Sequence, residues 1–252
     1  MTATIPTKTS SEIIYPDSDG QPMSDNTKQF ELIVTIQGGI DALFKDKENV
    51  FVAGDLLWYP VEGDNKTRQA PDTMVVFGRP KGDRGSYQQW IEDNIAPQVV
   101  FEIISPGNRM TAMYKLFKFY ENYGVEEYYV YDPEDNELMG WLRSEGKLNY
   151  IESIEGWVSP RLEIRFETAS GDLEIYQPDG LKFLSYVELS RQKELVQQQM
   201  ELTQQQMELT QQQMELTQQQ MEQERQEKEL VQQKADRLSE KLREMGINPE
   251  EI

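Results

Sequence analysis

Hydrophobic and polar positions follow a helical rhythm near the start of the chain. Between residues 25 and 45 apolar side chains recur at i, i+3 and i+4, and Asp25 or Asn26 is placed to cap a helix. We expect this helix to run to about Lys45. Its expected inner face comprises Phe30, Ile33, Val34, Gln37, Ile40, Leu43 and Phe44.

Short apolar runs follow, and they have the length of strands. Residues 50–52 with 56–59, 73–77 and 99–104 are predicted strands, and the last two are almost continuously apolar, as in strands buried on both faces. A second helix is expected over Met110–Tyr123, with Gly124 as its C-terminal cap. Its expected inner face comprises Met113, Leu116, Phe117 and Tyr120. A strand at 127–131 and antiparallel stretches at 138–143 and 148–154 complete an α/β core with a mixed sheet.

From about Glu188 a strict seven-residue repeat replaces this mixed pattern. The letters Met-Glu-Leu-Thr-Gln-Gln-Gln begin at residues 200, 207 and 214, and a fourth copy starts at Met221. Such a repeat without Pro or Gly is typical of a coiled-coil helix. We therefore expect homo-oligomerisation through residues 188–245, and low-complexity Gln expansion is the alternative. The expected seam comprises Val196, Met200, Thr203, Met207, Thr210, Met214, Thr217, Met221, Glu224, Lys228, Val231, Ala235, Leu238, Leu242 and Met245.

Composition narrows the chemistry that this fold can carry. The 252 residues include no His and no Cys. This excludes disulfide scaffolds, thiolate and imidazole metal sites, Ser-His-Asp triads and cysteine nucleophiles. Any hydrolysis must therefore depend on carboxylates, lysine, hydroxyl groups and a hard metal ion.

The chain is acidic, with 25 basic and 45 acidic side chains and a net charge of −20. Residues 1–185 hold 17 basic and 31 acidic side chains, a balance of −14 that opposes non-specific binding to phosphate backbones. The loop at residues 79–85 is a basic island that could contact phosphates, although a solvated hairpin loop is the more ordinary interpretation. No apolar run approaches the length of a membrane span, and we expect a cytoplasmic protein without a membrane partner.

Two carboxylates stand out by their surroundings. Asp72 opens a strand, and Glu102 lies inside the apolar run Val99–Ile104. A charged Glu there is costly unless it is paired or binds a cation. Acids on neighbouring strands can share one Mg²⁺ or Mn²⁺, which prefers oxygen ligands and activates water for phosphoryl chemistry. The alternative is a structural role, in which Glu102 pairs with Arg or Lys or caps a sheet end.

Several motifs in this order resemble the Uma-two family. They are Gln69-Ala70-Pro71-Asp72, Phe101-Glu102-Ile103-Ile104-Ser105-Pro106-Gly107-Asn108, Lys115 with Tyr120, Gly124-Val125-Glu126-Glu127-Tyr128-Tyr129 and Asp132-Pro133. The family is regarded as a restriction-endonuclease-like, PD-(D/E)xK-type group of DNA endonucleases with an αβββαβ core, and many members carry a coiled-coil extension. The resemblance covers roughly residues 25–180. It implies Asp72 and Glu102 as metal ligands and catalytic acids, and DNA as the substrate.

The resemblance departs from the family pattern at the lysine. In the PD-(D/E)xK pattern a lysine stands two residues after the second acid, where this chain has Ile104. The resemblance implies that the lysine has moved to the following helix, which makes Lys115 the best candidate and Lys118 the second. A His on the first helix, present in many members, is missing here. Asp55 is a possible third acid, and a turn at a strand end is its alternative role.

These observations predict three segments: a flexible lead-in at residues 1–24, a restriction-endonuclease-like domain at 25–187 and a coiled-coil tail at 188–252. The leading hypothesis is a Mg²⁺-dependent DNA endonuclease that uses Asp72, Glu102 and Lys115. The rival is a catalytically degenerate nuclease fold that serves as the head of a coiled-coil interaction protein. A hydrolase of RNA or nucleotides at the same site is the third hypothesis.

Overall fold

The structure is a computed structural model that describes residues 13–20, 24, 26–105 and 110–246. The chain divides into two compact units, residues 1–189 and 190–252, and each is considered by itself. The first unit holds two helices and ten strands among its described residues. The elements are α1 (Thr27–Leu43), β1 (Val50–Ala53), β2 (Trp58–Tyr59), β3 (Thr73–Phe77), β4 (Tyr87–Gln88), β5 (Val99–Ile103), α2 (Met110–Tyr123), β6 (Glu127–Asp132), β7 (Glu137–Ser144), β8 (Lys147–Tyr150), β9 (Arg165–Glu167) and β10 (Glu174–Tyr176).

A six-stranded mixed sheet forms the centre of the first unit, in the order β1-β3-β5-β6-β7-β8. Only the β5–β6 pair within it is parallel, because α2 connects these two strands and returns the chain to the same end of the sheet. Leaving out the short strands β2 and β4, the order is α1, β1, β3, β5, α2, β6. This confirms the predicted restriction-endonuclease-like αβββαβ core with added hairpins.

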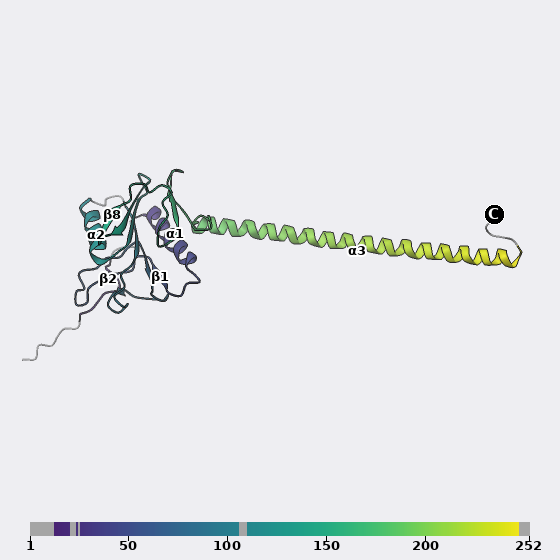
Figure 1. The fold of residues 1–252 in the computed structure, drawn as a ribbon, viewed down its shortest axis with the longest axis horizontal. Helices are drawn as coiled ribbons and strands as arrows, with labels where there is room; N and C mark the ends of the chain where they lie inside the picture. Colours follow the sequence, from purple (N-terminus) through teal and green to yellow (C-terminus); the bar gives the residue numbers. More distant parts are fainter. Residues whose placement is uncertain (1–12, 21–23, 25, 106–109, 247–252) are drawn as a thin grey trace, which may run out of the picture. The chain divides into compact units, whose positions relative to one another are not determined.

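The two helices cover opposite faces of the sheet (Figure 1). Side chains alternate between faces along each strand, so Val75 and Phe101 pack in the core beneath α1, whereas Met74 and Val100 pack beneath α2. Strands β3 and β5 are therefore buried on both faces. This explains why their sequences are apolar without alternation.

The buried face of helix α1 agrees only in part with the expected one: Ile33 and Ile40 are buried, as expected. Asn26 caps it by accepting a hydrogen bond from the Gln29 backbone N–H, whereas Asp25 lies outside the described residues. Phe30 and Val34 were expected inside, but their exposed fractions are 48% and 42%. That part of the prediction is wrong, because a neighbouring stripe, richer in isoleucine, has the same helical period. The buried face comprises Gln29, Ile33, Ile36 and Ile40.

Helix α2 has the bounds that the sequence predicts, and Tyr120 is its buried residue. Met113, Leu116 and Phe117 are half-buried against the same core. Gly124 follows with φ of 96°, a left-handed conformation that glycine adopts without steric cost. The helix therefore stops where β6 must begin.

Part of the predicted flexible lead-in lies outside the described residues, but residues within 13–20 pack against the rest of the first unit. Tyr15 packs on Tyr59 and Trp90, with ring centroids 5.2 and 4.9 Å away. The Tyr59 hydroxyl donates to the Pro16 carbonyl at 2.7 Å. These contacts bring Asp19 towards the turn after β1, where burial raises the pKa of Asp55 and the charge of Asp19 raises it further.

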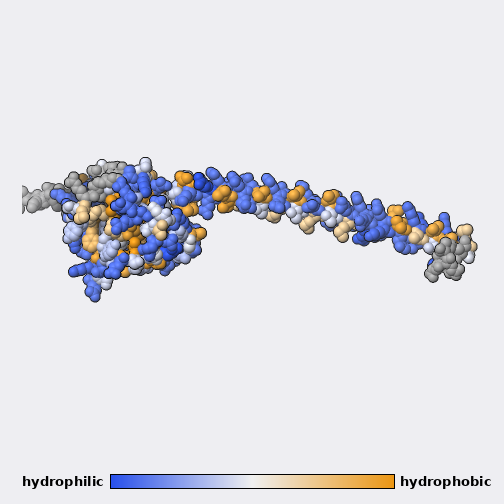
Figure 2. All heavy atoms as spheres, turned by 90° about the horizontal axis from the view of Figure 1, so that it is seen from above, coloured by the Kyte–Doolittle hydropathy of each residue, from blue (hydrophilic) through white to orange (hydrophobic). Residues whose placement is uncertain are grey.

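The second unit is the main part of helix α3 (Tyr186–Glu244), which has no buried residue among those described. Its 59 residues correspond to about 88 Å of helix. Apolar side chains lie exposed along it (Figure 2). Within the described part of the chain, no helix is both long enough and apolar enough to cross a membrane.

Candidate active site

The sheet register brings Asp72 and Glu102 together. Strands β3 and β5 are antiparallel, with Thr73 opposite Phe101, and Asp72 is the residue directly before β3, so the continued register leads from Asp72 to Glu102. The Asp72 side chain accepts a hydrogen bond from Ile103, and its charge acts on Glu102, as this register implies. Directly opposite residues have Cβ atoms about 4.5–5.5 Å apart and point to the same face. That face is the one beneath α2, because Met74 and Val100, each two residues away from one of the acids and so on the same face, pack there. The strand pairing thus creates a carboxylate pair beneath α2.

Each acid accepts a hydrogen bond from a defined donor. The Ile103 backbone N–H donates to Asp72 Oδ2 at 2.6 Å, and the Tyr120 hydroxyl donates to Glu102 Oε1 through a short hydrogen bond. Asp72 is buried, with 9% of its surface exposed, and Glu102 is half-buried. The two acids are therefore fixed by the backbone of β5 and by a side chain of α2.

Burial raises the pKa of the Glu102 carboxyl well above its ordinary value, and the charge of Asp72 raises it further. The hydrogen bond from Tyr120 acts in the opposite direction, and the charge of Asp55 adds another increase. Two carboxylates this close resist carrying two negative charges together. A divalent cation would relieve that repulsion.

Asp55 is both a turn residue and an electrostatic neighbour of the pair. Its φ of 49° is left-handed, and its backbone N–H donates to the Pro71 carbonyl at 3.0 Å. At the preceding Gly54 an added Cβ would lie 3.2 Å from the Asp72 carbonyl oxygen, so a glycine allows this close approach. The charge of Asp19, after the larger effect of burial, raises the pKa of Asp55.

The candidate lysines are not paired with the acids in this structure. Within the described residues, Lys115 is exposed on α2 and makes no ion pair with Asp72 or Glu102. Lys118 forms an ion pair with Glu121 at 2.7 Å. Ile104, at the usual lysine position, is a half-buried apolar residue packed against the α2 core. The role assigned to Lys115 therefore stays a prediction.

The basic loop at residues 79–85 is neutralised by nearby acids. Arg79 and Arg84 both pair with Glu92, at 2.8 and 2.7 Å, and Lys81 pairs with Asp41 at 2.6 Å. The Arg84 guanidinium also lies over the Phe51 ring, 3.9 Å from its centroid. These pairs favour the hairpin-loop interpretation over a phosphate contact.

The donor set fits a hard divalent ion. Carboxylate oxygens are the ligands that Mg²⁺ and Mn²⁺ prefer, and Mg²⁺ commonly uses one or two carboxylates and keeps several waters. Among the described residues, no group of three or more acidic side chains is placed to hold a metal ion. Asp72 and Glu102 therefore suit a two-carboxylate site completed by water and substrate.

Sequence reasoning missed the tyrosines around the acids. Tyr120 was expected only as a core residue, yet its hydroxyl reaches Glu102. The Tyr128 hydroxyl is buried without a hydrogen-bond partner among the described residues. Burial raises the pKa of Tyr128, and the charges of Glu102 and Asp72 add to this. One sequence signal could have identified Tyr128. Side chains alternate between the two faces along a strand, and this alternation in β6 puts Tyr128 on the same face as the acids.

The αβββαβ order, with an acid pair on two neighbouring central strands, defines a restriction-endonuclease-like fold. The chain belongs to the Uma2 family, described as putative restriction endonuclease, which matches residues 19–169. Solved structures similar to this chain include a putative nuclease of the DUF820 group from Anabaena variabilis. It has 16% sequence identity and a TM-score of 0.40, and the match covers 54% of this chain and 72% of that chain. No curated protein matches the chain.

Proposed function

We propose that the chain is a metal-dependent DNA endonuclease that hydrolyses phosphodiester bonds at Asp72 and Glu102. The observation that carries this proposal is the acid pair itself, with Asp72 directly before β3 and Glu102 in the neighbouring strand β5. Membership of a family of putative restriction endonucleases supports DNA as the substrate. Mg²⁺ or Mn²⁺ is the proposed ion.

In this proposal Asp72 and Glu102 would hold the ion, which when bound would supply an activated water and counter charge on the phosphate. The backbone N–H of Ile103 fixes the orientation of Asp72. Lys115 is the proposed cation that stabilises phosphate charge when DNA is bound, because its exposed side chain on α2 is free of acidic partners among the described residues.

A cleavage assay on supercoiled plasmid tests the proposal, with Mg²⁺ or Mn²⁺ titrated and a chelator as the blank. Asp72→Asn and Glu102→Gln should abolish cleavage and leave the fold intact, because both side chains act as ligands. Glu137→Gln, which removes an exposed acid from β7, is the matched control and should cut like the parent. A folded Glu102→Gln variant that cuts as fast as the parent would contradict the site assignment.

The second candidate is a catalytically degenerate head on an interaction protein. Two observations favour it: the charge of −14 on residues 1–185, and the absence of an ion pair between Lys115 and the acids within the described residues. RNA and nucleotide substrates in the same assay distinguish the third hypothesis, a hydrolase of RNA or nucleotides, from a DNA endonuclease. Failure to cut DNA, RNA and nucleotides at saturating metal would favour the degenerate head.

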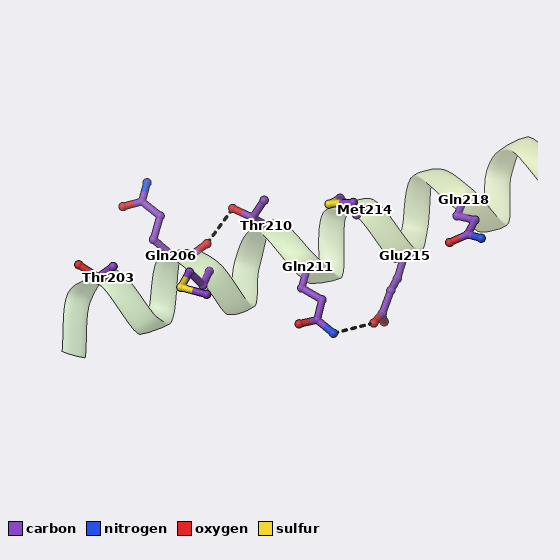
Figure 3. Close-up of a pocket in the computed structure, with 8 residues that line it drawn as sticks. Thr203, Gln206, Thr210, Gln211, Met214, Glu215 and Gln218 are labelled. Atoms are coloured by element: carbon purple, nitrogen blue, oxygen red, sulfur yellow. Dashed lines mark hydrogen bonds between the residues drawn. The ribbon is translucent and has the colours of Figure 1, made fainter. Parts of the chain in front are cut away.

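We also propose that α3 pairs with further copies of the chain. Thr203, Thr210 and Thr217 each donate to a backbone carbonyl four residues earlier at 2.8 Å, so burying these positions leaves no hydroxyl unpaired. A shallow groove runs along this Met and Thr face (Figure 3). It is lined by Thr203, Gln206, Met207, Thr210, Gln211, Met214, Glu215 and Gln218. Such a groove between side chains of one helix fits the knobs of a partner helix.

Sedimentation of the full chain at micromolar concentration tests this pairing. Met207→Glu with Met214→Glu should convert oligomers to monomers, because it places charges in the seam. The matched control, Gln205→Glu with Gln212→Glu, adds the same charge on a different face and should leave the oligomer intact. A parent chain that sediments as a monomer would end the pairing proposal.

A further inference from the structure

The hydrogen bond between Tyr120 and Glu102 connects the second helix to the acid pair. Tyr120 is fully buried, with 0% of its surface exposed, and its hydroxyl donates to Glu102 Oε1. This hydrogen bond is a polar contact between α2 and β5 at the proposed site. Because Glu102 stands in an otherwise apolar strand, this donor determines where one of its carboxyl oxygens lies.

The Tyr120 ring is itself held firmly. It stacks on the Trp58 ring with centroids 6.4 Å apart and an interplanar angle of 6°. The Phe119 ring packs edge-on against it, with centroids 5.6 Å apart. Tyr128 covers another side with centroids 5.0 Å apart. A hydroxyl on a ring packed by three aromatic neighbours is a rigid donor, whereas a lysine or a water would be mobile.

Packing alone does not require this hydroxyl. A phenylalanine at position 120 would keep the same ring contacts with Trp58, Phe119 and Tyr128. The hydroxyl is used on Glu102, and within the described residues Oε2 of Glu102 has no hydrogen bond. Tyr120 thus fixes one oxygen and leaves the other available to a ligand.

We propose that Tyr120 is a positioning residue, whose hydroxyl orients the Glu102 carboxylate for binding of a divalent cation. The proposal rests on the proposed nuclease function and assigns Tyr120 no contact with the substrate. Outer hydrogen-bond partners of metal ligands typically change metal affinity 10- to 100-fold when removed. Tyr120→Phe should weaken Mn²⁺ binding by about that factor.

The chain offers a matched control in Tyr128. Its ring lies in the same aromatic cluster and is equally buried, but its hydroxyl has no hydrogen-bond partner among the described residues. Tyr128→Phe removes the same atom from the same surroundings without removing the contact to Glu102. It should bind Mn²⁺ with the affinity of the parent.

The experiment measures free Mn²⁺ by electron paramagnetic resonance during titration of the parent, Tyr120→Phe and Tyr128→Phe proteins. Plasmid cleavage is measured at low and at saturating Mn²⁺. If Tyr120 acts through the ligand, Tyr120→Phe cuts poorly at low Mn²⁺ and recovers at saturation. Parent-like affinity in Tyr120→Phe, or an equal loss in both variants, would overturn the proposal.

A second measurement keeps the inference separate from the nuclease proposal. In denaturant unfolding of the metal-free protein, Tyr120→Phe and Glu102→Ala form a double-mutant cycle. If the hydroxyl orients Glu102, the two substitutions are non-additive; additive effects overturn the inference. Should the parent neither bind Mn²⁺ nor cut DNA, the nuclease proposal fails, and this cycle alone decides whether Tyr120 positions Glu102.

Discussion

Glu127 in β6 and Glu102 in β5 are both glutamates in apolar strands, but they face opposite sides of the sheet. Glu127 is fully buried and accepts hydrogen bonds from the Tyr129 hydroxyl at 2.8 Å, the Ser159 hydroxyl at 2.5 Å and the Arg161 backbone N–H at 2.6 Å. Both of its oxygens are therefore satisfied by the protein. It connects β6 to the loop before β9, which is a structural task.

Among the described residues, Glu102 accepts one hydrogen bond, from the Tyr120 hydroxyl, and the charge of Asp72 acts on it. Burial raises the pKa of both glutamates, but for Glu127 the hydrogen bonds counter the effect, whereas for Glu102 the charge of Asp72 adds to it. A buried acid with complete partners stabilises a fold. A buried acid close to another acid is destabilised in its charged form, and a bound cation would offset that repulsion.

The largest expected effect is a difference in the free energy of unfolding between alanine variants of the two glutamates. Glu127→Ala leaves the hydroxyls of Tyr129 and Ser159 without their acceptor, and each unsatisfied buried donor costs about 1–3 kcal/mol. We expect the free energy of unfolding to fall by about 3 kcal/mol. Chemical denaturation measures this. Glu102→Ala leaves the Tyr120 hydroxyl without its acceptor but also removes the repulsion with Asp72, so it should cost clearly less than Glu127→Ala. An equal loss in both variants would remove the distinction.

The second prediction uses pH. The pKa of Glu102 is higher in the folded state than in the unfolded state, so folding favours its protonated form. Its contribution to stability is therefore present at low pH and is lost as pH rises from about 4.5 through the raised value. Unfolding free energies of the parent should fall relative to Glu102→Gln over that window. Parallel pH curves for the two proteins would contradict the raised pKa.

The smallest expected effect compares one buried hydroxyl near each glutamate, one that is hydrogen-bonded and one that is not. Ser159→Ala removes one hydrogen bond to Glu127 and should cost about 1 kcal/mol. Tyr128→Phe removes a buried hydroxyl that is unpaired among the described residues, and it should be neutral or slightly stabilising. Thermal denaturation of both variants checks the order. A larger loss in Tyr128→Phe than in Ser159→Ala would show that the hydroxyl has a partner.

The sequence was sufficient for the order of the αβββαβ core elements and for singling out Asp72 and Glu102 as neighbouring acids. Continuous apolar runs identified β3 and β5, and a glutamate inside the second run is unusual enough to indicate a site. The face of α1 was not predictable, because Phe30 and Val34 follow the same period as Ile33 and Ile36. The helical period alone does not determine which of two adjacent apolar stripes is buried, because the buried stripe is the one that contacts the sheet.

Polar contacts between distant elements were also beyond the sequence. Whether Tyr120 reaches Glu102 depends on the rotation of α2 over the sheet, which packing determines. The basic loop shows the converse: its charges suggested a phosphate contact, yet Glu92 and Asp41 lie close enough to neutralise them. Composition counts charges along the chain, whereas pairing is set by tertiary structure.

Direct measurement of Mn²⁺ binding by the parent, Glu102→Gln and Glu127→Gln proteins tests the central claim, that the acid opposed by a second acid holds a divalent ion. All three are kept well below their unfolding temperatures, and circular dichroism confirms that they are folded. We predict saturable binding by the parent and by Glu127→Gln, and loss of that binding in Glu102→Gln. Binding that survives in Glu102→Gln with the parent's affinity would contradict the claim.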